Sequence, residues 1–541
     1  CETNSELFCQ VFVYDSTAPV SGITTPAVGY VNSDMNQFTG IAADSVGAGP
    51  SGLRAVKVAV RRCSDATCNT GNFWNWNNPG AFSVAITENV TWADVGIGWS
   101  TGVPSGMLVE GNTYYVVARA VDYATNEEQD GIGQGRQFLY DITDPRTAIV
   151  LPQPSTAYWN LPMITGTFAD NLSPMTTIQV VLQDAADRYY NGTSFNTTLF
   201  NANQHWRGVT AYASSWTFIA PTSLFSSNAD YKVWIRGEDA AGNEDVANTE
   251  PSAGSARLLR WDTQQPVSVA TAPANNSAGR NPVFIFAGTA ADLGGAGVRN
   301  VKFRVLRNDN TWLNVINKVF DGATGNNTSN FPFSTNGTTI WSRNLSSDHD
   351  LTTEGYRYQT ITRSLDNSRD GSLPVADPDE YRQYETVFTS SSYVIDNSTP
   401  TFVINTPEQT FPGFDFVTSI STFSGVVTDT VNFSADRIYE AGIATRAADQ
   451  SIMVGIKQLR DEGLWWNPAS STFSVVSSTP YWGYGQIPNF FNDGTSVVGK
   501  SSGTWEFYVN ASRLQNNTSY YINVMVKDTV GNMSNVYSTG A

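Results

Sequence analysis

The sequence predicts an all-β protein made of four tandem immunoglobulin-like antiparallel sandwiches arranged as a linear rod. Short segments of alternating apolar and polar residues, such as 56–61, 301–305 and 452–457, are separated by Gly, Pro and Asn turns. One pattern of marker residues recurs four times, and 541 residues suffice for about four domains of ordinary size. Helical periodicity is nearly absent.

The start of each predicted domain is marked by an apolar strand that ends in Asp, with Pro four residues later. The marking pairs are Asp15 and Pro19, Asp141 and Pro145, Asp262 and Pro266, and Asp396 and Pro400. The aspartates lie 126, 121 and 134 residues apart, and 145 residues follow the last one. We therefore predict an N-terminal donor-like strand at 1–14 and domains at 15–141, 142–262, 263–396 and 397–541.

Two further marks recur inside each predicted domain. A Gly-x-x-x-Asp motif follows the boundary Pro by 21 to 25 residues, at Gly40, Gly166, Gly288 and Gly425. A Tyr-led alternating strand then closes on Asp, beginning at Tyr114, Tyr231, Tyr356 and Tyr520. Asn follows that Asp at the fourth position in three domains, whereas the third has Asp370 there.

The boundary Asp-x-x-x-Pro and strand ends such as Asp239-Ala-Ala-Gly-Asn243 resemble the bacterial immunoglobulin-like (Big-type) repeats of large surface adhesins and extracellular filaments. The resemblance covers essentially the whole chain. It implies the fold and an extracellular or cell-surface location, but its motifs are structural and say much less about the task. Fibronectin type III domains are the nearest alternative fold.

Three aspartates of each domain are expected at the pole that faces the preceding domain, because strands of equal parity end at the same pole of an antiparallel sandwich. The expected groups are Asp15, Asp44 and Asp122; Asp141, Asp170 and Asp239; Asp262, Asp292 and Asp366; and Asp396, Asp429 and Asp528. Three carboxylates repel one another, and Ca²⁺ is the natural compensating cation outside cells. The similar adhesin repeats hold Ca²⁺ at linkers. The alternative is that these residues only bond nearby turn amides.

The fourth domain is predicted to lack its own final strand. Only nine residues follow Asn532, whereas the other domains use 15 to 26 residues to reach their terminal Asp. The chain opens with a strand that belongs to no preceding domain, with Leu7, Phe8, Val11, Phe12, Val13 and Tyr14 as its contact residues. We predict that this strand completes the fourth domain of a neighbouring copy, giving a head-to-tail filament. Two alternatives stay open: a segment of a longer periodic protein, or self-completion at Val536 and Tyr537.

Charge and motif content restrict the function. A net charge of −18 argues against nucleic-acid partners, and no apolar run approaches the roughly 18 residues that direct membrane insertion requires. Only His205 and His349 are available for acid–base chemistry, and no nucleophile-elbow or nucleotide-binding motif occurs, so we expect no enzyme and no cofactor beyond Ca²⁺. The predicted partners are copies of itself, with surface proteins or glycans as further candidates. An adhesin stalk or surface-layer component is the alternative, signalled by an aromatic cleft near Trp74 and Trp76 or near Trp465 and Trp466.

Cysteines and sequons fit an exterior protein. Cys1 with Cys9, and Cys63 with Cys68, form two close pairs that predict local disulfides in an oxidising compartment. Metal binding by the second pair and acylation of Cys1 are the alternatives. Asn-x-Ser/Thr sequons mark candidate glycosylation at Asn89, Asn191, Asn196, Asn326, Asn344, Asn432 and Asn516.

Overall fold

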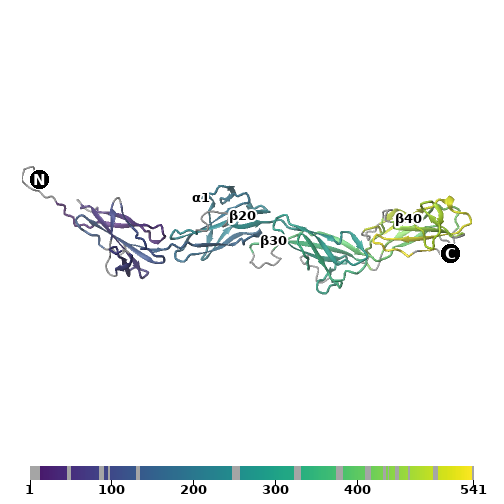
Figure 1. The fold of residues 1–541 in the computed structure, drawn as a ribbon, viewed down its shortest axis with the longest axis horizontal. Coiled ribbons are helices and arrows are strands. Elements are labelled where there is room, and N and C mark those ends of the chain that lie inside the picture. Colours follow the sequence, from purple (N-terminus) through teal and green to yellow (C-terminus); the bar gives the residue numbers. More distant parts are fainter. Residues whose placement is uncertain are drawn as a thin grey trace, which may run out of the picture. The chain divides into compact units, whose positions relative to one another are not determined.

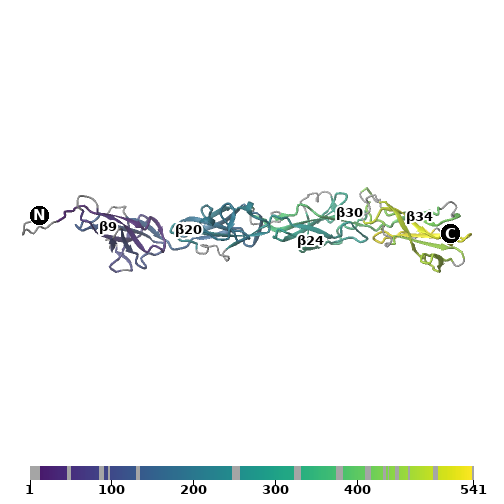
Figure 2. The same cartoon turned by 90° about the horizontal axis from the view of Figure 1, so that it is seen from above.

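The computed structural model describes residues 12–44, 50–78, 80–84, 91–95, 98–129, 135–245, 256–321, 331–372, 382–408, 416–430, 434–435, 438–444, 450–460, 463–491, 498–535 and 537–538. It is nearly all β, and the α-helical content of these residues is one short helix, α1 (Ala202–His205). Two compact units, Cys1–Trp261 and Asp262–Ala541, divide the chain. Each unit holds two sandwiches, which we call modules 1 and 2 and modules 3 and 4 (Figures 1 and 2). The domain boundaries themselves stay predictions.

Module 1 closes its two sheets through a strand that crosses between them. Its strands are β1 (Val20–Thr25), β2 (Gly29–Val31), β3 (Gln37–Ala43), β4 (Leu53–Cys63), β5 (Gly71–Trp74), β6 (Phe82–Val84), β7 (Thr91–Val95), β8 (Trp99–Gly102), β9 (Thr113–Asp122) and β10 (Arg136–Tyr140). The pairing order is β1-β3-β8-β7-β4-β9-β10-β2, with β5 and β6 beside β4. β7 pairs with β4 of one sheet and with β8 of the other.

Module 2 repeats this arrangement around a second core. Its strands are β11 (Arg146–Leu151), β12 (Thr156–Asn160), β13 (Met163–Ala169), β14 (Met175–Gln183), β15 (Tyr189–Tyr190), β16 (Phe195–Thr197), β17 (Arg207–Gly208), β18 (Thr210–Ala211), β19 (Ser215–Ile219), β20 (Ala229–Asp239) and β21 (Arg257–Trp261). One sheet has the order β11-β13-β19-β18, and the other contains β16-β15-β14-β20-β21-β12. The crossing segment pairs with β14 through β17 and with β19 through β18.

Module 3 has a three-stranded sheet facing a larger one. Its strands are β22 (Val267–Ala272), β23 (Ser277–Gly279), β24 (Ile285–Ala291), β25 (Val298–Arg307), β26 (Trp312–Leu313), β27 (Phe320–Asp321), β28 (Phe333–Ser334), β29 (Ile340–Asn344), β30 (Arg357–Asp370), β31 (Arg382–Tyr384) and β32 (Ser390–Ile395). The smaller sheet has the order β22-β24-β29. In the larger sheet β30 lies between β25 and β32.

Module 4 follows the same plan. Its strands are β33 (Thr401–Thr406), β34 (Thr422–Thr428), β35 (Ile452–Gln458), β36 (Trp465–Asn467), β37 (Thr472–Val475), β38 (Gly483–Tyr484), β39 (Gln486–Phe491), β40 (Ser502–Tyr508), β41 (Tyr520–Val526) and β42 (Tyr537–Ser538). The two sheets have the orders β33-β34-β40-β39 and β37-β36-β35-β41-β42, with β38 beside β35.

A buried Trp packed over a Gly lies at the centre of every module. Trp99 covers Gly40, and the same pair recurs as Trp216 with Gly166, Trp341 with Gly288, and Trp505 with Gly425. A methyl group on Gly40 would lie 2.4 Å from the Trp99 ring and 2.0 Å from the backbone oxygen of Gly22 in the first strand. The Gly of the Gly-x-x-x-Asp motif is therefore required by close packing.

In all four modules, a Tyr at or near the start of β9, β20, β30 or β41 forms a hydrogen bond with the backbone of the residue five positions earlier. The Tyr114, Tyr231 and Tyr520 hydroxyls accept hydrogen bonds from the backbone N–H groups of Val109, Ser226 and Gln515, at 2.7 to 2.8 Å. In module 3 the corresponding residue is Tyr358, which donates to the Thr353 carbonyl oxygen at 2.7 Å. The prediction that Tyr356 leads this strand is thus wrong, because the Tyr in the equivalent position is Tyr358, two residues later.

A buried acid joins the first strand of modules 1 to 3 to the opposite sheet. The Ser21, Thr147 and Ser268 hydroxyls donate to Glu128, Asp245 and Glu385, at 2.5 to 2.6 Å. Glu128 also accepts from the Ala120 backbone N–H in β9, and Glu385 from that of Ser364 in β30. We call each of these contacts between a hydroxyl and an acid an inter-sheet pair. In module 4 its two positions hold Phe402 and Ser534.

Module 4 has a short final strand where the sequence predicted none. β42 pairs Tyr537 with Val524 and Ser538 with Asn523. The final strands of modules 1 to 3 pair instead around the leading Tyr, as Phe138 does with Tyr114. Within the described residues, the start of β41 at Tyr520 therefore has a partner strand on one side only, formed by β35.

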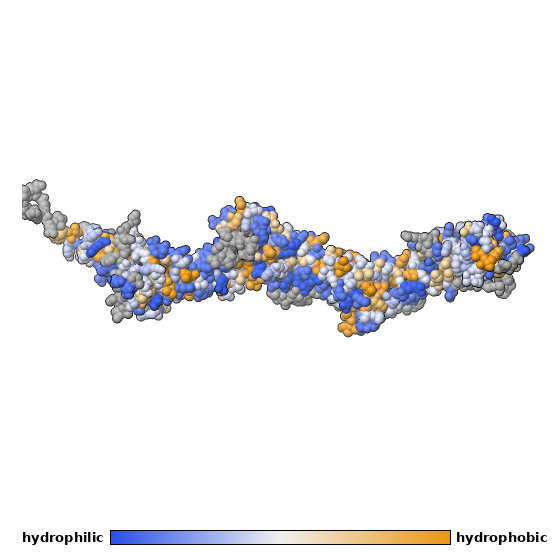
Figure 3. All heavy atoms as spheres, in the orientation of Figure 1, coloured by the Kyte–Doolittle hydropathy of each residue, from blue (hydrophilic) through white to orange (hydrophobic). Residues whose placement is uncertain are grey.

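Small apolar groups are scattered over a predominantly hydrophilic surface (Figure 3). The large aromatic residues lie mostly inside: Trp74, Trp465 and Trp466 are 1 to 3% exposed. Trp76 packs against the module 1 core. None of the four therefore forms part of an open aromatic platform. No helix within the described ranges has the length and apolar character needed to cross a membrane.

Candidate metal centres

The structure brings together the three aspartates predicted for each module. In every group, one carboxylate oxygen from each residue lies within 4.8 Å of the others. We number the groups as triads 1 to 4, formed by Asp15, Asp44 and Asp122; Asp141, Asp170 and Asp239; Asp262, Asp292 and Asp366; and Asp396, Asp429 and Asp528. The linker supplies the first aspartate, and the middle one directly follows β3, β13, β24 or β34. The third is the last residue of β9 or β20, lies within β30, or follows β41 by two residues.

In triads 1, 3 and 4, two consecutive backbone N–H groups that precede β4, β25 or β35 in the chain orient two of the carboxylates. In triad 1, Ser51 donates to Asp15 Oδ2 and Gly52 to Asp44 Oδ2, both at 2.7 Å. The corresponding donors are Ala296 and Gly297 in module 3, and Ala441 and Gly442 in module 4. All three glycines have a positive φ of 80° to 86°, a region that favours Gly. The sequence motifs did not predict these donors.

An Asn amide ties the third aspartate to the linker in triads 1, 2 and 4. Asn126 Nδ2 donates to Asp122 Oδ2 at 2.8 Å and to the Asp15 backbone oxygen at 3.0 Å. Asn243 and Asn532 make the same two contacts. In triad 3, the Ser368 backbone and hydroxyl groups donate to Asp366 Oδ1. Asp370, which stands where the others have Asn, accepts from Ser372.

Every triad keeps at least one buried carboxylate oxygen that has no hydrogen-bond partner among the described residues. These atoms are Asp44 Oδ1, Asp141 Oδ2, Asp170 Oδ2, Asp366 Oδ2 and Asp429 Oδ1. Asp141, Asp366 and Asp429 are at most 1% exposed. A buried acceptor without a donor is costly. Turn chemistry alone, the alternative interpretation, leaves these atoms unexplained.

The second unit holds the most strongly perturbed carboxyl groups. Burial raises the pKa of Asp429 to about 8, and Asp396, Asp528 and Glu440 add to the shift. Burial also raises the pKa of Asp366 to about 7 and that of Asp396 to about 6, each with a neighbouring aspartate contributing. In triad 1 the pKa of Asp15 is lowered by the backbone hydrogen bonds of Ser51 and Thr17. Triads 3 and 4 therefore demand a proton or a cation.

The donor set of each triad fits a hard divalent cation. Carboxylate oxygens are the ligands that Ca²⁺ prefers, and three of them leave room for backbone or water oxygens within its usual six to eight. The unpartnered buried oxygens provide places for such an ion. Among the residues that the structure describes, no His or Cys joins these groups, so the ligand chemistry differs from that of a zinc site.

Some of the remaining predicted residues are described by the structure, and the others lie outside the described ranges. Cys63 and Cys68 are joined by a disulfide. Phe12, Val13 and Tyr14 are 80%, 62% and 83% exposed. The sequons at Asn196, Asn344 and Asn516 are exposed, and that at Asn191 is half-buried. The other predicted residues lie outside the described ranges: Cys1, Cys9, Leu7, Phe8, Val11, Asn89, Asn326 and Asn432.

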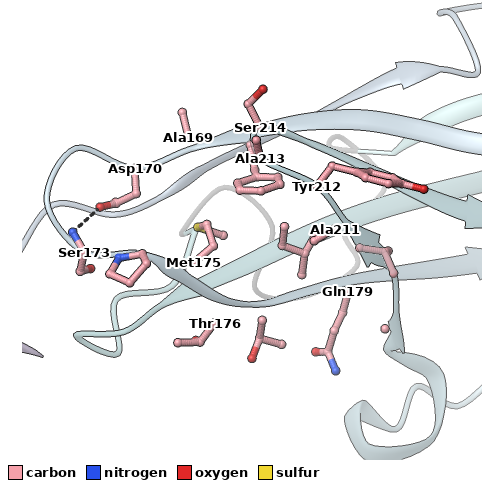
Figure 4. Close-up of a pocket in the computed structure, with 16 residues that line it drawn as sticks. Ala169, Asp170, Ser173, Met175, Thr176, Gln179, Ala211, Tyr212, Ala213 and Ser214 are labelled. Carbon is pink, nitrogen blue, oxygen red and sulfur yellow. Dashed lines mark hydrogen bonds between the residues drawn. The ribbon is translucent and has the colours of Figure 1, made fainter. Parts of the chain in front are cut away.

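A cleft of about 740 Å³ adjoins triad 2. It lies between β14, the end of β13 and the crossing segment, and Asp170 and Ser173 are among its lining residues. Figure 4 places these two residues at one end of the cleft and Tyr212 and Gln179 toward the other. Of the three triad residues, Asp170 lines the cleft, so the cleft borders triad 2 at that residue.

The comparisons with known proteins concern the fold class. No family model and no curated protein matches the sequence. The chain is similar to a tetra-tandem repeat in the extending region of a large adhesion protein, at 12% identity over 96% of this chain and 97% of that chain, with a TM-score of 0.26. It is also similar to Sidekick-1 immunoglobulin domains 1–5, at 10% identity over 96% and 79%, with a TM-score of 0.24.

A third similar structure, the fibronectin(III)-like modules of Clostridium thermocellum CbhA, is 12% identical and covers 46% of this chain and 94% of that chain, with a TM-score of 0.23. The sheets of the present chain themselves display the tandem antiparallel sandwiches that the sequence predicted.

Proposed function

We propose that this chain is a structural subunit of an extracellular or cell-surface assembly, and that Ca²⁺ bound at the triads stiffens the junctions between its sandwiches. The observation that carries the proposal is the recurrence of one triad per module, each including the Asp that begins the linker. A single catalytic site would not be repeated in this way. Recurrence at every linker suits an architectural role.

Each linker that lies within one compact unit already contacts the module before it. The Thr143 hydroxyl, two residues after Asp141, donates to Glu110 of module 1. The equivalent contact in the second unit is made by the Asn397 backbone N–H, which donates to Glu354 of module 3 at 3.0 Å. A cation in the triad would fix the module on the other side of the same linker. Both ends of the linker would then be held.

We further propose that copies assemble head to tail through the segment that ends at Asp15, which would form a strand on the neighbouring copy. In modules 1 to 3, the residue three positions before the terminal Asp stands opposite the leading Tyr, as Phe138 does opposite Tyr114. The same offset places Phe12 of one copy opposite Tyr520 of another. Phe12 is 80% exposed, and a partner strand there would extend the sheet by β-augmentation.

An engineered disulfide tests this register. Leu139 pairs with Thr113 in module 1, so Val13 of one copy should meet Ser519 of the next. The double variant V13C/S519C should give a ladder of covalent oligomers on oxidation, and electron microscopy should show filaments. Y14C/S519C, shifted by one residue, should crosslink much less because its side chain points to the other face. Equal ladders from both, or dispersed particles under all conditions, would refute strand complementation.

A further inference from the structure

Triad 2 is oriented differently from the other three. The Gly that donates its N–H to the middle aspartate in modules 1, 3 and 4 is replaced by Pro174, which has no N–H to give. The backbone N–H groups of Leu172 and Ser173 both donate to a single oxygen, Asp170 Oδ1, at 2.9 Å. Neither of these two N–H groups donates to Asp170 Oδ2 or to the Asp141 carboxylate.

Three buried oxygen atoms at this triad consequently lack a hydrogen-bond partner within the described part of the chain. They are Asp141 Oδ2, Asp170 Oδ2 and Ser173 Oγ. Asp141 is fully buried and Ser173 is 3% exposed. No other triad combines two such carboxylate oxygens with a hydroxyl. A cation bound here would satisfy these atoms at once.

The cleft beside triad 2 gives such a cation access to an external ligand. Asp170 and Ser173 belong both to the triad region and to the cleft wall (Figure 4). A volume of about 740 Å³ lies within the range of small-molecule sites. Three carboxylates also leave several of the six to eight positions of Ca²⁺ for water or ligand oxygens.

The lining of the cleft favours a hydroxylated ligand. Tyr212, which is 59% exposed, and Phe168 present aromatic surface, and Gln179 and Ser214 add polar groups to the lining, with Gln179 Oε1 already accepting from Arg236. A saccharide matches both kinds of surface, because its ring carries apolar C–H faces and its hydroxyl oxygens suit a hard cation. We propose that a cation held by triad 2 keeps coordination positions open toward this cleft and there binds hydroxyl oxygens of a neutral saccharide. This inference rests on the proposed cation site.

Europium luminescence tests the open positions directly, because the decay rates in H₂O and D₂O give the number of water molecules on the ion. The full-length variant D44N/D292N/D429N leaves triad 2 intact, and D44N/D170N/D429N leaves triad 3 intact as the matched control. The probes are neutral oligosaccharides of glucose, mannose, xylose and N-acetylglucosamine. We expect at least one of them to displace water from Eu³⁺ in the first variant and none to do so in the second. Adding Tyr212→Ala should weaken saccharide binding about tenfold and leave Eu³⁺ affinity unchanged.

The possible results separate this inference from the broader proposal. If neither variant binds Eu³⁺, the cation proposal and this inference both fail. If both bind the ion but no saccharide changes the decay in the first variant, only the open-site inference fails. N-acetylneuraminic acid is added as an acidic probe, and water displacement by it but by none of the neutral oligosaccharides would also overturn the inference, because the ligand would then be a carboxylate. Displacement of water by a saccharide in both variants would overturn the inference, because open coordination positions would then not be particular to triad 2.

Discussion

The side-chain amide of Asn243 donates a hydrogen bond to the backbone oxygen of Asp141, which lies 102 positions earlier in the sequence. The two atoms are 3.0 Å apart, and the same amide donates to Asp239 at 2.8 Å. One side chain thereby fixes the linker to the end of the sixth strand. Asn126 and Asn532 repeat this contact in modules 1 and 4.

Replacing Asn243 by Ala should destabilise the protein by about 1–3 kcal/mol, because buried acceptors on Asp141 and Asp239 would lose their donor. Urea unfolding in EDTA measures the loss. Asn196→Ala, at an exposed Asn of the same module, is the control and should change stability little. Equal effects of the two substitutions would mean that the amide contributes nothing.

Asp429→Asn should have opposite effects with and without metal. In EDTA it removes one of several mutually repelling buried acids, so the unfolding temperature should rise or stay unchanged. In millimolar Ca²⁺ it removes a ligand, so the stabilisation by Ca²⁺ should shrink. Differential scanning calorimetry measures both. Asp34→Asn, at an exposed turn, should leave the Ca²⁺ response as in the wild type.

Metal-free protein should lose stability as the pH rises. The folded-state pKa values of Asp396, Asp366 and Asp429 are about 6, 7 and 8, against an ordinary value of 3.8. A raised folded-state pKa means that the folded protein holds the proton more tightly than the unfolded chain does. The stability from these groups is therefore fully present below about pH 4 and is lost as the pH rises through 6 to 8.

Thermal unfolding of the full chain in EDTA at pH 5 and pH 9 checks this expectation for the transition of the second unit. Ca²⁺ competes with protons for the same oxygens, so its stabilising effect should be larger at pH 9 than at pH 5. A transition temperature that is independent of pH in EDTA would contradict the expected shifts.

Gly40→Ala should cost roughly 1–3 kcal/mol or more, because the added methyl group overlaps the Trp99 ring and the Gly22 carbonyl oxygen. Gly102 lies in the same sheet of module 1, and a methyl group there meets no atom within 4 Å. Gly102→Ala is therefore the matched control. Tryptophan fluorescence during chemical unfolding should show a large shift for the first variant and a small one for the second.

The sequence sufficed to predict the triads because their members follow from strand parity. Asp44 and Asp122 end strands that point to the same pole, whatever the exact loop geometry. The N–H donors of Gly52 and its equivalents were missed because a donor is set by loop conformation. A Ser-Gly or Ala-Gly dipeptide directly before β4 and β25 was the available signal, but in module 4 the dipeptide lies ten residues before β35.

Other details could not be predicted from the alternation of apolar and polar residues alone. Tyr356 and Tyr358 are two residues apart and lie on the same face, with ring centroids separated by 6.4 Å, so the pattern does not choose the one that leads the strand. The acidic residues of the inter-sheet pairs are also hard to predict, because their distance from the preceding Asp varies between modules. Glu128 follows Asp122 by six residues, whereas Glu385 follows Asp366 by nineteen, across an insertion.

The replacement of the inter-sheet pair in module 4 by Phe402 and Ser534 has a mechanical consequence. Ser534 accepts a hydrogen bond from the Val526 backbone, but the first strand contributes no hydroxyl to it. A pull on the chain ends would shear the first strand of each sandwich against its neighbours, and in modules 1 to 3 the buried hydrogen bond between a hydroxyl and a carboxyl group resists that slip. We expect module 4 to yield at the lowest force, which would make it the extensible element of the proposed assembly.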